Sequence, residues 1–481
     1  MLTAPVNTAV PIMLIGFLVL LMLLTTSGHK ARQPKRALVC AVTGLLAAIY
    51  IVWRVRAAWS LEADDAGVVW IWVCTVVDVI GLLDFILFML LMSRFVDRTE
   101  AAQLAEQRLR GRPEHELPDV DVWIATYDEA WSILEKTIVG ARNLDWPQHK
   151  LHIYVLDDGR RAWLEERCGN LGLSYITRPD NRDRKAGNHN NALRVTKSPF
   201  ILTLDADFIP FRHAIRRMIG LLDDPTVAIV QSPQAYYNHA PFRSNLMLHD
   251  AIPDDLELFY KAMQPSRDAW NAAFYCGTSA VLRRSALEAV GGFATESDIE
   301  DQITSLALLS HGYRTVFLAE RLSVGLAPES SAALHDQRNR WCRGSLQILF
   351  TRYGPFGRGF TLTQRLFFLQ SYWVLGAFLP LFYAILPCSV WLFGARLFPH
   401  VNPTDLAVMP TVLLLAIWLS LAWVSDRTWI PIVTQAFQLF TAVEQLPTAL
   451  ASLIKPFGKP LSINQGIQFP LVELQTQCEM V

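Results

Sequence analysis

FILTLDADF, residues 200–208, is a short apolar run that ends in two carboxylates, Asp205 and Asp207. Two earlier stretches have the same form, VDVWIATYDEA (120–130) and LHIYVLDDG (151–159). Such runs are typical of parallel strands covered by helices on both faces, and ligands bind beyond the carboxyl ends of these strands. One acid after a strand is often only a turn or helix-capping residue, but three groups favour a shared crevice. The sequence therefore predicts an α/β domain with an acidic site.

The spacing of Asp205 and Asp207 predicts a metal site. Mg²⁺ takes one or two carboxylates and completes its coordination with water and substrate phosphates. The sequence contains no Walker-type and no GxGxxG phosphate loop. The charge of a bound diphosphate would therefore be met by the metal and by basic side chains such as Lys185 and Arg340.

A second pair of acids, Glu300 and Asp301, begins the helical pattern IEDQITSLALLSHGY (299–313). Acids are favoured at a helix N-terminus, so one of them can be purely structural. If this helix start faces the crevice, the other can act as a general base on an acceptor hydroxyl.

The stretch QRNRW (337–341) adds polar and aromatic groups. Gln337 offers an amide, Arg340 a guanidinium that suits phosphate, and Trp341 an indole on which a sugar ring can stack. The alternative is a Trp and an Arg that anchor the chain at a membrane surface.

Apolar windows long enough to cross a bilayer flank this domain. The chain has 481 residues, of which 52% are apolar. We expect five spans, near residues 10–26, 37–53, 68–92, 372–393 and 406–424. The predicted organisation is an amino-terminal membrane region (1–93), a cytosolic domain (94–358) and a carboxyl-terminal region (359–481) with two spans and an interfacial helix.

Basic residues predict the orientation of the spans. Lys30, Arg32, Lys35 and Arg36 lie between the first two spans, whereas no basic residue precedes the first. The positive-inside rule places that loop and the domain in the cytosol and the amino terminus outside. The apolar stretch 428–455 contains several polar residues and Pro447, so we expect it to lie along the membrane surface.

Net charge and cysteine spacing argue against nucleic-acid binding, zinc sites and disulfides. The net charge is −1, which gives no basic field for nucleic acid. The seven cysteines include no Cys-x-x-Cys pair, so neither zinc nor disulfides are expected.

Taken together, the motifs resemble those of processive membrane-integrated family 2 glycosyltransferases, in particular the bacterial cellulose synthase catalytic subunit and its curdlan synthase relatives. The resemblance covers about residues 54–459. Its motifs are TYDE (126–129), VLDDG (155–159), KAGN (185–188), DAD (205–207), VQSPQ (230–234), FYCGTSAVLRR (274–284), IED (299–301), GLAPE (325–329) and QRNRW (337–341).

The resemblance implies an α/β GT-A-type glycosyltransferase domain inserted between α-helical transmembrane segments of the bacterial inner membrane. Such an enzyme takes a UDP-sugar, here UDP-glucose, inverts the anomeric centre and lengthens a β-glucan acceptor while moving it outward. It needs Mg²⁺, with Mn²⁺ as the alternative ion.

Residue roles follow by position in the same motifs. In the donor site, Thr126, Tyr127 and Glu129 with Asp158 would hold the uridine, and Lys185 would lie near the diphosphate. Asp157 and Asp205 would also bind the donor, with the metal on Asp205 and Asp207. Asp301, next to Glu300, would be the catalytic base, and Gln337 and Arg340 would bind the diphosphate. Trp341 would stack on the acceptor sugar, and Cys276 and Gly277 would line the acceptor site.

Several features depart from the best-known members. Ile299 stands where the family has Thr, and PLSINQG (460–466) lacks the aromatic residue and the lysine of the family's gating loop. The two further spans and the PilZ domain of cellulose synthases are not seen, so we expect that an accessory subunit could complete the channel. The alternatives are a β-1,3 or mixed-linkage synthase, a UDP-GlcNAc-using synthase or a truncated non-catalytic homologue.

Overall fold

The computed structural model describes residues 7–24, 28–29, 31–60, 67–245, 247, 252–254, 256–370, 373–394, 397–398 and 400–457. The chain forms two compact units. The first comprises Met1–Phe95, Leu248–Ser266 and Leu369–Leu450, and the second comprises Val96–Met247, Arg267–Phe368 and Ala451–Val481. The loop 460–466 that departs from the family lies outside the described residues.

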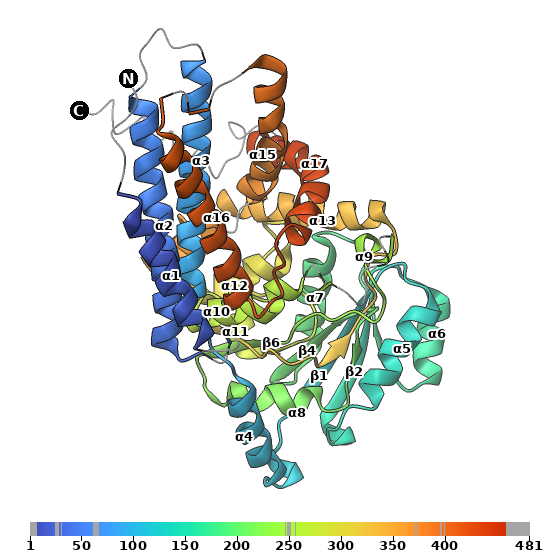
Figure 1. Ribbon diagram of the computed structural model, residues 1–481. Coiled ribbons are helices and arrows are strands. Elements are labelled where there is room, and N and C mark those ends of the chain that lie inside the picture. The colour runs from blue at the N-terminus through green and yellow to red at the C-terminus, as the bar shows by residue number, and fades with distance from the viewer. Residues whose placement is uncertain are drawn as a thin grey trace, which may run out of the picture. The chain divides into compact units, whose positions relative to one another are not determined.

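The first unit is built from helices (Figure 1). They are α1 (Ala9–Leu23), α2 (Gln33–Trp59), α3 (Val68–Met92), α15 (Trp373–Phe393), α16 (Pro403–Val424), most of α17 (Val433–Ile454), the π-helix η4 (Phe259–Met263) and the start of α10 (Gln264–Ala269). Four described segments are long and apolar enough to cross a membrane: Gln33–Trp59, Val68–Met92, Gly376–Phe393 and Pro403–Val424. Four of the five expected spans are thus confirmed as apolar helices of spanning length. Helix α1 has 15 residues and is shorter.

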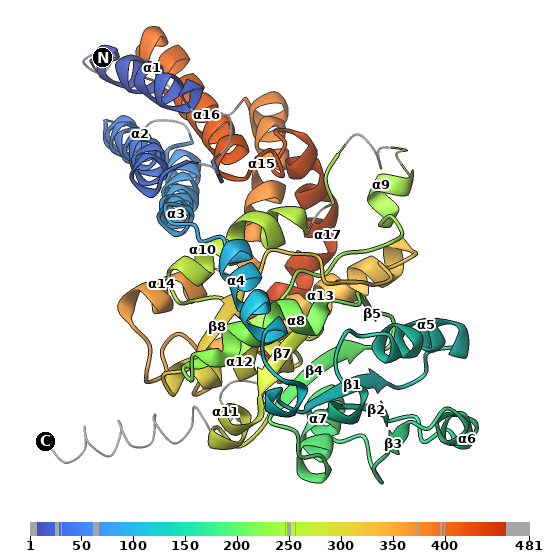
Figure 2. The same ribbon diagram turned by 90° about the horizontal axis from the view of Figure 1, so that it is seen from below.

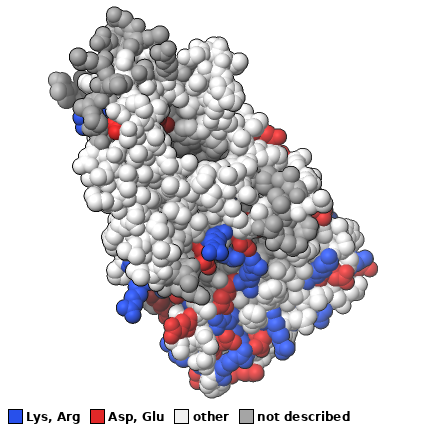
Figure 3. Space-filling view, in the orientation of Figure 1, with Lys and Arg blue, Asp and Glu red and all other residues white. Residues whose placement is uncertain are grey.

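A charged pair lies inside this unit. The Arg54 Nε atom of α2 is 2.9 Å from Asp78 Oδ2 of α3, and the Tyr383 hydroxyl donates to Asp78 Oδ1 at 2.8 Å. The guanidinium of Arg54 also lies over the Phe398 ring at 4.4 Å. Charged groups are costly in lipid unless they are paired, and Asp78 is paired with both Arg54 and Tyr383. Elsewhere on the visible surface of these helices, charged side chains are sparse (Figure 3).

The predicted interfacial segment forms helix α17, with Pro447 inside it. It is not among the described helices that are apolar enough to span a membrane. Its position along a membrane surface stays a prediction.

The second unit contains a seven-stranded sheet in the order β3-β2-β1-β4-β7-β6-β8. The strands are β1 (Val120–Thr126), β2 (Leu151–Asp157), β3 (Ser174–Ile176), β4 (Phe200–Asp205), β6 (Val227–Gln231), β7 (Ala280–Arg283) and β8 (Arg314–Phe317). The first four are parallel to one another, and β7 is antiparallel to both of its neighbours. A small second sheet pairs β5 (Ile209–Pro210) with β9 (Ser323–Val324).

Helices cover both faces of this sheet (Figures 1 and 2). Successive side chains of a strand point to opposite faces, so Val122 and Ile124 enter one apolar cluster and Trp123 the other. The first cluster includes α4 (Thr99–Arg110), α5 (Trp131–Arg142), α6 (Ala162–Asn170) and α8 (Ala214–Ile219), and the second includes α7 (Arg184–Val195), α11 (Arg284–Ala289) and α12 (Glu300–Ser310). The remaining helices are α9 (Pro241–Asn245), α13 (Ser331–Leu349), α14 (Leu362–Gln370) and the 3-10 turns η1 (Glu114–Glu116), η2 (Gln148–Lys150) and η3 (Gly220–Asp223).

The strand register brings the acidic strand ends together. Thr126 at the end of β1 is opposite Asp157 at the end of β2, and Ala125 is opposite Asp205 at the end of β4. The predicted parallel strands with a shared acidic edge are therefore confirmed.

Candidate active site

Lys185 links acids from two different elements. It lies in the first turn of α7, and its Nζ atom is paired with the Asp205 carboxylate. The same atom donates to the Gly277 carbonyl at 2.9 Å and lies 3.9 Å from Glu300 Oε1. Burial by itself would lower the pKa of Lys185, but the charges of Asp205 and Glu300 outweigh it, and the pKa is raised. The lysine therefore stays cationic between carboxylates.

Asp301 lies beside this lysine, at the start of α12. Its Oδ1 atom accepts from the Gln302 backbone N–H at 2.7 Å. A Cβ atom added to Gly277 would lie 3.0 Å from Asp301 Oδ2 and 3.4 Å from Lys185 Nζ, so both groups border this glycine. Burial and the charge of Glu300 raise the pKa of Asp301 to about 7, although the Gln302 N–H, Lys185 and Arg340 act in the opposite direction. A carboxyl group that titrates near neutral pH is suited to proton transfer.

Asp205 and Asp207 form the candidate metal site. The backbone N–H of Asp205 donates to Thr278 Oγ1 at 3.0 Å, which fixes the end of β4. Burial and the nearby charge of Asp205 raise the pKa of Asp207 to about 7. Two carboxylates that repel each other in this way fit a divalent cation, because its charge would compensate both. The described residues contain no group of three or more metal-ligating side chains, so substrate and water would supply the other ligands.

Hydrogen bonds fix the segment that carries Cys276 and Gly277. Tyr275 is buried, and its hydroxyl lies 2.7 Å from both Thr203 Oγ1 and the Gly277 carbonyl. The Cys276 N–H donates to Gln231 Oε1 at 2.9 Å, and the Gln234 amide donates to the Cys276 carbonyl at 2.7 Å. These bonds fix the backbone next to Lys185 and Asp301.

The end of β1 forms a separate polar turn. Glu129 Oε2 accepts from the Thr126 hydroxyl at 2.6 Å and from the Tyr127 N–H at 2.8 Å. Arg161 donates to Thr126 Oγ1 at 2.7 Å and to the Glu129 carbonyl at 2.8 Å. The Tyr127 side chain is exposed. The structure thus brings together three of the four residues expected to hold the uridine, and adds Arg161.

The two acids at the end of β2 have different surroundings. Asp157 is fully buried and accepts from the Gly159 N–H at 2.8 Å, from the Tyr175 hydroxyl at 2.9 Å and from Arg161. These contacts lie within the protein, so Asp157 supports the turn rather than facing a ligand. The Asp158 carboxylate accepts hydrogen bonds from Nε and from one terminal nitrogen of Arg178.

Helix α13 carries Gln337, Arg340 and Trp341. Gln337 and Trp341 are half-buried, Arg340 is exposed, and its charge acts on Asp301. The Trp341 ring lies 4.8 Å from the Arg338 guanidinium. Of the three, Arg340 is close enough for its charge to lower the pKa of Asp301, and the sugar-stacking role of Trp341 stays a prediction.

Helix α13 also anchors the turn before Asp301. The Asp298 N–H donates to Gln347 Oε1 at 2.8 Å, and Arg343 Nε donates to Asp298 Oδ2 at 2.6 Å. A Cβ atom on Gly344 would lie 2.8 Å from the Ile299 side chain, so helix and turn are in close contact. Sequence reasoning did not find Gln347, Arg161 or Arg178. In the sequence each of these residues is only a long polar side chain near a strand end or on a helix. Many surface positions have the same feature, so it does not indicate a site residue.

Comparison with known proteins shows what this chain is similar to. Residues 121–291 match the family described as glycosyl transferase family 2. The cellulose synthase catalytic subunit (UDP-forming) of Pseudomonas fluorescens (strain SBW25) is 42% identical over 292 residues, which are 60% of this chain and 39% of that protein. The cellulose synthase 1 catalytic subunit (UDP-forming) of Komagataeibacter xylinus is 37% identical over 347 residues, 72% of this chain and 45% of that protein. A solved mannosyltransferase of Pyrobaculum calidifontis, in complex with GDP-Man and Mn²⁺, is 21% identical with a TM-score of 0.47, and the match covers 76% of this chain and 98% of that one.

The sheet, its acidic edge and the match over residues 121–291 define a family 2 glycosyltransferase domain, which confirms the predicted GT-A-type fold class. Over 292 and 347 residues the chain is similar to the two bacterial cellulose synthase subunits. The chain spans less than half the length of each of these two relatives.

Proposed function

We propose that the protein is an inverting, processive glycosyltransferase that takes glucose from UDP-glucose and lengthens a β-1,4-linked glucan. The observation that carries this proposal is the position of Asp301, a carboxyl group with a pKa of about 7 that borders the same glycine as Lys185, which is itself paired with Asp205. A candidate base, a cation and a candidate metal ligand thus lie together. The names of the two relatives, cellulose synthase catalytic subunits described as UDP-forming, support UDP as the leaving group.

In the proposed reaction Asp301 accepts the proton of the acceptor hydroxyl. That oxygen forms a bond to the anomeric carbon while the bond from this carbon to the diphosphate oxygen breaks, and UDP leaves. A single displacement inverts the anomeric configuration, so an α-linked donor gives a β-linked chain. Lys185 and Arg340 bind the diphosphate, and Trp341 stacks on the acceptor sugar. Mg²⁺ or Mn²⁺ held by Asp205 and Asp207 would compensate the charge of the leaving group.

The proposal also covers the site of action. We place the domain on the cytosolic side of the bacterial inner membrane, with the growing polysaccharide moving outward between apolar helices. Four helices of spanning length support a membrane location. An accessory subunit that completes the channel is part of this proposal.

The test is polymer formation by the purified full chain in lipid vesicles with radiolabelled UDP-glucose and Mg²⁺. We expect insoluble label that a β-1,4-specific glucanase removes, and no label with Asp301→Asn. Label removed only by a β-1,3-specific glucanase would show that the chain makes a β-1,3 linkage instead of the proposed β-1,4 linkage. Polymer formed from UDP-GlcNAc alone would show that UDP-GlcNAc, and not UDP-glucose, is the donor. UDP binding without polymer from either donor would favour a non-catalytic homologue.

A further inference from the structure

Arg178 contacts two parts of the candidate active site, Asp158 after β2 and the turn 182–184 before α7. It follows β3, and only 8% of the residue is exposed. Its Nε donates to Asp158 Oδ1 and one terminal nitrogen donates to Asp158 Oδ2, both at 2.7 Å. Such a two-point pair fixes the plane of the carboxylate, whose oxygens keep further lone pairs that can accept from a ligand.

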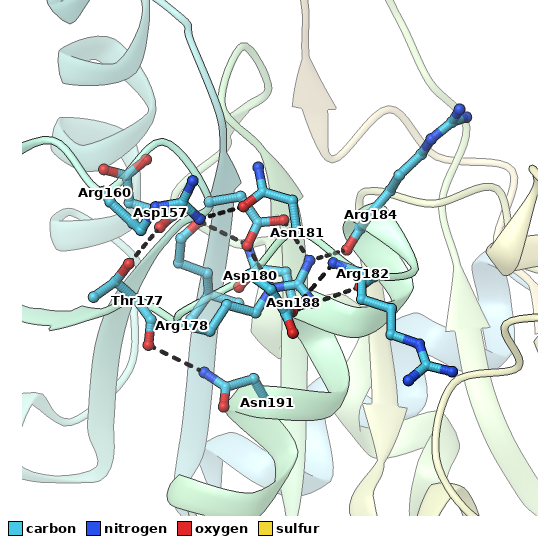
Figure 4. A network of polar contacts seen from close by, with 12 residues as sticks. Asp157, Arg160, Thr177, Arg178, Asp180, Asn181, Arg182, Arg184, Asn188 and Asn191 are labelled. Atoms are coloured by element: carbon cyan, nitrogen blue, oxygen red, sulfur yellow. Dashed lines mark hydrogen bonds and ion pairs between the residues drawn. The ribbon is translucent and has the colours of Figure 1, made fainter.

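The same guanidinium also holds the turn before α7. Its terminal nitrogens donate to the Arg182 carbonyl at 2.5 Å and to the Arg184 carbonyl at 2.8 Å (Figure 4). Asp183 and Arg184 have φ values of 58° and 46°, which is the left-handed region that side chains other than glycine rarely adopt. A turn with two such residues needs external contacts to persist, and Arg178 supplies them.

Glycine at position 187 is explained by this arrangement. A Cβ atom there would lie 2.1 Å from the Arg182 carbonyl oxygen and 2.3 Å from an Arg178 terminal nitrogen. A side chain at 187 would therefore displace the guanidinium from the turn. The glycine of KAGN thus keeps room for Arg178.

Lys185 comes directly after this turn, so the position of its ammonium group depends on it. A second contact, from the Asn188 amide to the Leu156 carbonyl at 2.9 Å, also ties α7 to β2. Asp158 lies on the side where a nucleoside is expected, and Lys185 contacts Asp205 on the side of the diphosphate. One guanidinium is therefore bonded both to an expected nucleoside ligand and to the turn that carries an expected diphosphate ligand.

We propose that Arg178 is a positioning residue for the nucleotide, which keeps Asp158 and Lys185 at the spacing that a nucleoside diphosphate requires. This inference rests on the proposed function. Arg178 does not itself contact the reacting atoms; it acts through Asp158 and through the turn 182–184. Loss of its forked contact should thus weaken nucleotide binding in a folded protein.

The chain offers a matched control for a merely structural ion pair. Arg284 is also buried, donates to Asp121 Oδ2 at 2.8 Å and to the Ser198 carbonyl at 2.6 Å. Asp121 is the second residue of β1, far along the strand from its acidic end. Lysine at either position keeps the charge and removes the fork.

The experiment measures UDP affinity by calorimetry and the KM and kcat for UDP-glucose, with the full chain and a fixed Mg²⁺ concentration. We expect Arg178→Lys to weaken UDP binding and raise KM by about ten- to hundredfold, the effect of a displacement of about 1 Å at a site. Arg284→Lys should lower the melting temperature without changing UDP affinity. If Arg178→Lys does not fold, Gly187→Ala replaces it, with Gly169→Ala as its control, because no atom lies within 4 Å of a Cβ added at 169.

The outcomes separate the inference from the proposed function. Wild-type protein that binds no UDP would contradict the proposed function itself. Wild-type protein that binds UDP, with Arg178→Lys or Gly187→Ala binding it equally well, would overturn the role of Arg178 alone. Equal losses of UDP affinity in the Arg178 and Arg284 variants, in proportion to lost folded protein, would also overturn it.

Discussion

Asp301 and Lys185 illustrate how neighbouring charges prepare two side chains for different tasks. Both are half-buried, but Lys185 has carboxylates around it and keeps its charge, whereas Asp301 has Glu300 beside it and titrates near neutral pH. Desolvation disfavours the charged form of each group, and the sign of the adjacent charge decides the outcome. A base and a cation can thus coexist next to one glycine.

The raised pKa of Asp301 predicts a pH dependence. Asp301 must be deprotonated to accept a proton, so its basic form is available above a pKa of about 7 and is lost below it. We expect kcat/KM for UDP-glucose to fall as the pH decreases through about 7, approaching a tenfold loss for each further unit. UDP affinity measured without Mg²⁺ over the same range is the control, because the candidate metal ligand Asp207 also has a pKa of about 7. A rate that stays constant between about pH 5.5 and 8 would remove Asp301 from the role of base.

Asp205 predicts a metal dependence of nucleotide binding. Removal of one of two candidate ligands in Asp205→Ala should weaken Mg²⁺-dependent UDP binding by about ten- to hundredfold, as the loss of supporting groups does at other metal sites. Asp224→Ala changes an exposed acid next to β6 and should have no effect. If the Asp205 variant binds UDP as tightly as the wild type does, both with and without Mg²⁺, the metal assignment is wrong.

At the scale of elements, the site depends on where strands and helices end. The turn before β7 contains Gly277, whose φ of 87° suits glycine and whose missing side chain leaves room for Asp301 and Lys185. The turn therefore serves two purposes, a left-handed conformation and close contact between charged groups. A helix start, a strand end and this turn together define the candidate active site.

Alanine substitutions at two glycines, Gly277 and Gly312, distinguish the effect of backbone strain from the effect of contact with Asp301. Gly277 and Gly312 both have a φ of 87°, so alanine at either should cost about 1–2 kcal/mol of backbone strain. Only at 277 would the methyl group press on the Asp301 carboxylate; at 312 no atom lies within 4 Å. We expect Gly277→Ala to lower kcat by about a hundredfold, as misplacement of a reacting group by about 1 Å does, and Gly312→Ala to leave it unchanged. The same loss of kcat in both variants would attribute the effect to strain alone.

The sequence predicted those parts of this arrangement that depend on local patterns. Apolar runs before Asp158 and Asp205 indicated buried parallel strands, and the period of 299–313 indicated a helix that starts near Asp301. The contacts of Arg161 and Arg178 were not predictable, because a long side chain can reach many partners and the sequence does not specify which turn it meets. The burial of Asp157 and Asp158 was also not predicted, because acids that follow a strand are usually exposed.

At the scale of the whole molecule, two kinds of surface meet in one chain. Charged side chains are dense on the visible surface of the second unit and sparse on that of the first (Figure 3). Helices such as α2 and α16 suit a lipid environment by length and composition, whereas the glycosyltransferase domain suits water. The chain thus combines a domain with a charged surface and apolar helices on both sides of it in the sequence.

The proposed orientation predicts the accessibility of single cysteines in a background without the native ones. A cysteine at Thr404, exposed at the start of α16, should react with a membrane-impermeant reagent added outside the cell, because that end is proposed to face outward. A cysteine at Gln103, exposed on α4, should react only after the membrane is opened. The reverse pattern would contradict the cytosolic location of the domain.

The most direct test of the central claim compares transfer and binding in Asp301→Asn. This substitution keeps the shape of the side chain and removes its ability to accept a proton at neutral pH. We expect UDP release from UDP-glucose to fall by about a hundred- to ten-thousandfold while UDP affinity, measured by calorimetry, stays close to that of the wild type. Turnover that survives in Asp301→Asn at the wild-type level would show that Asp301 is not the base we propose.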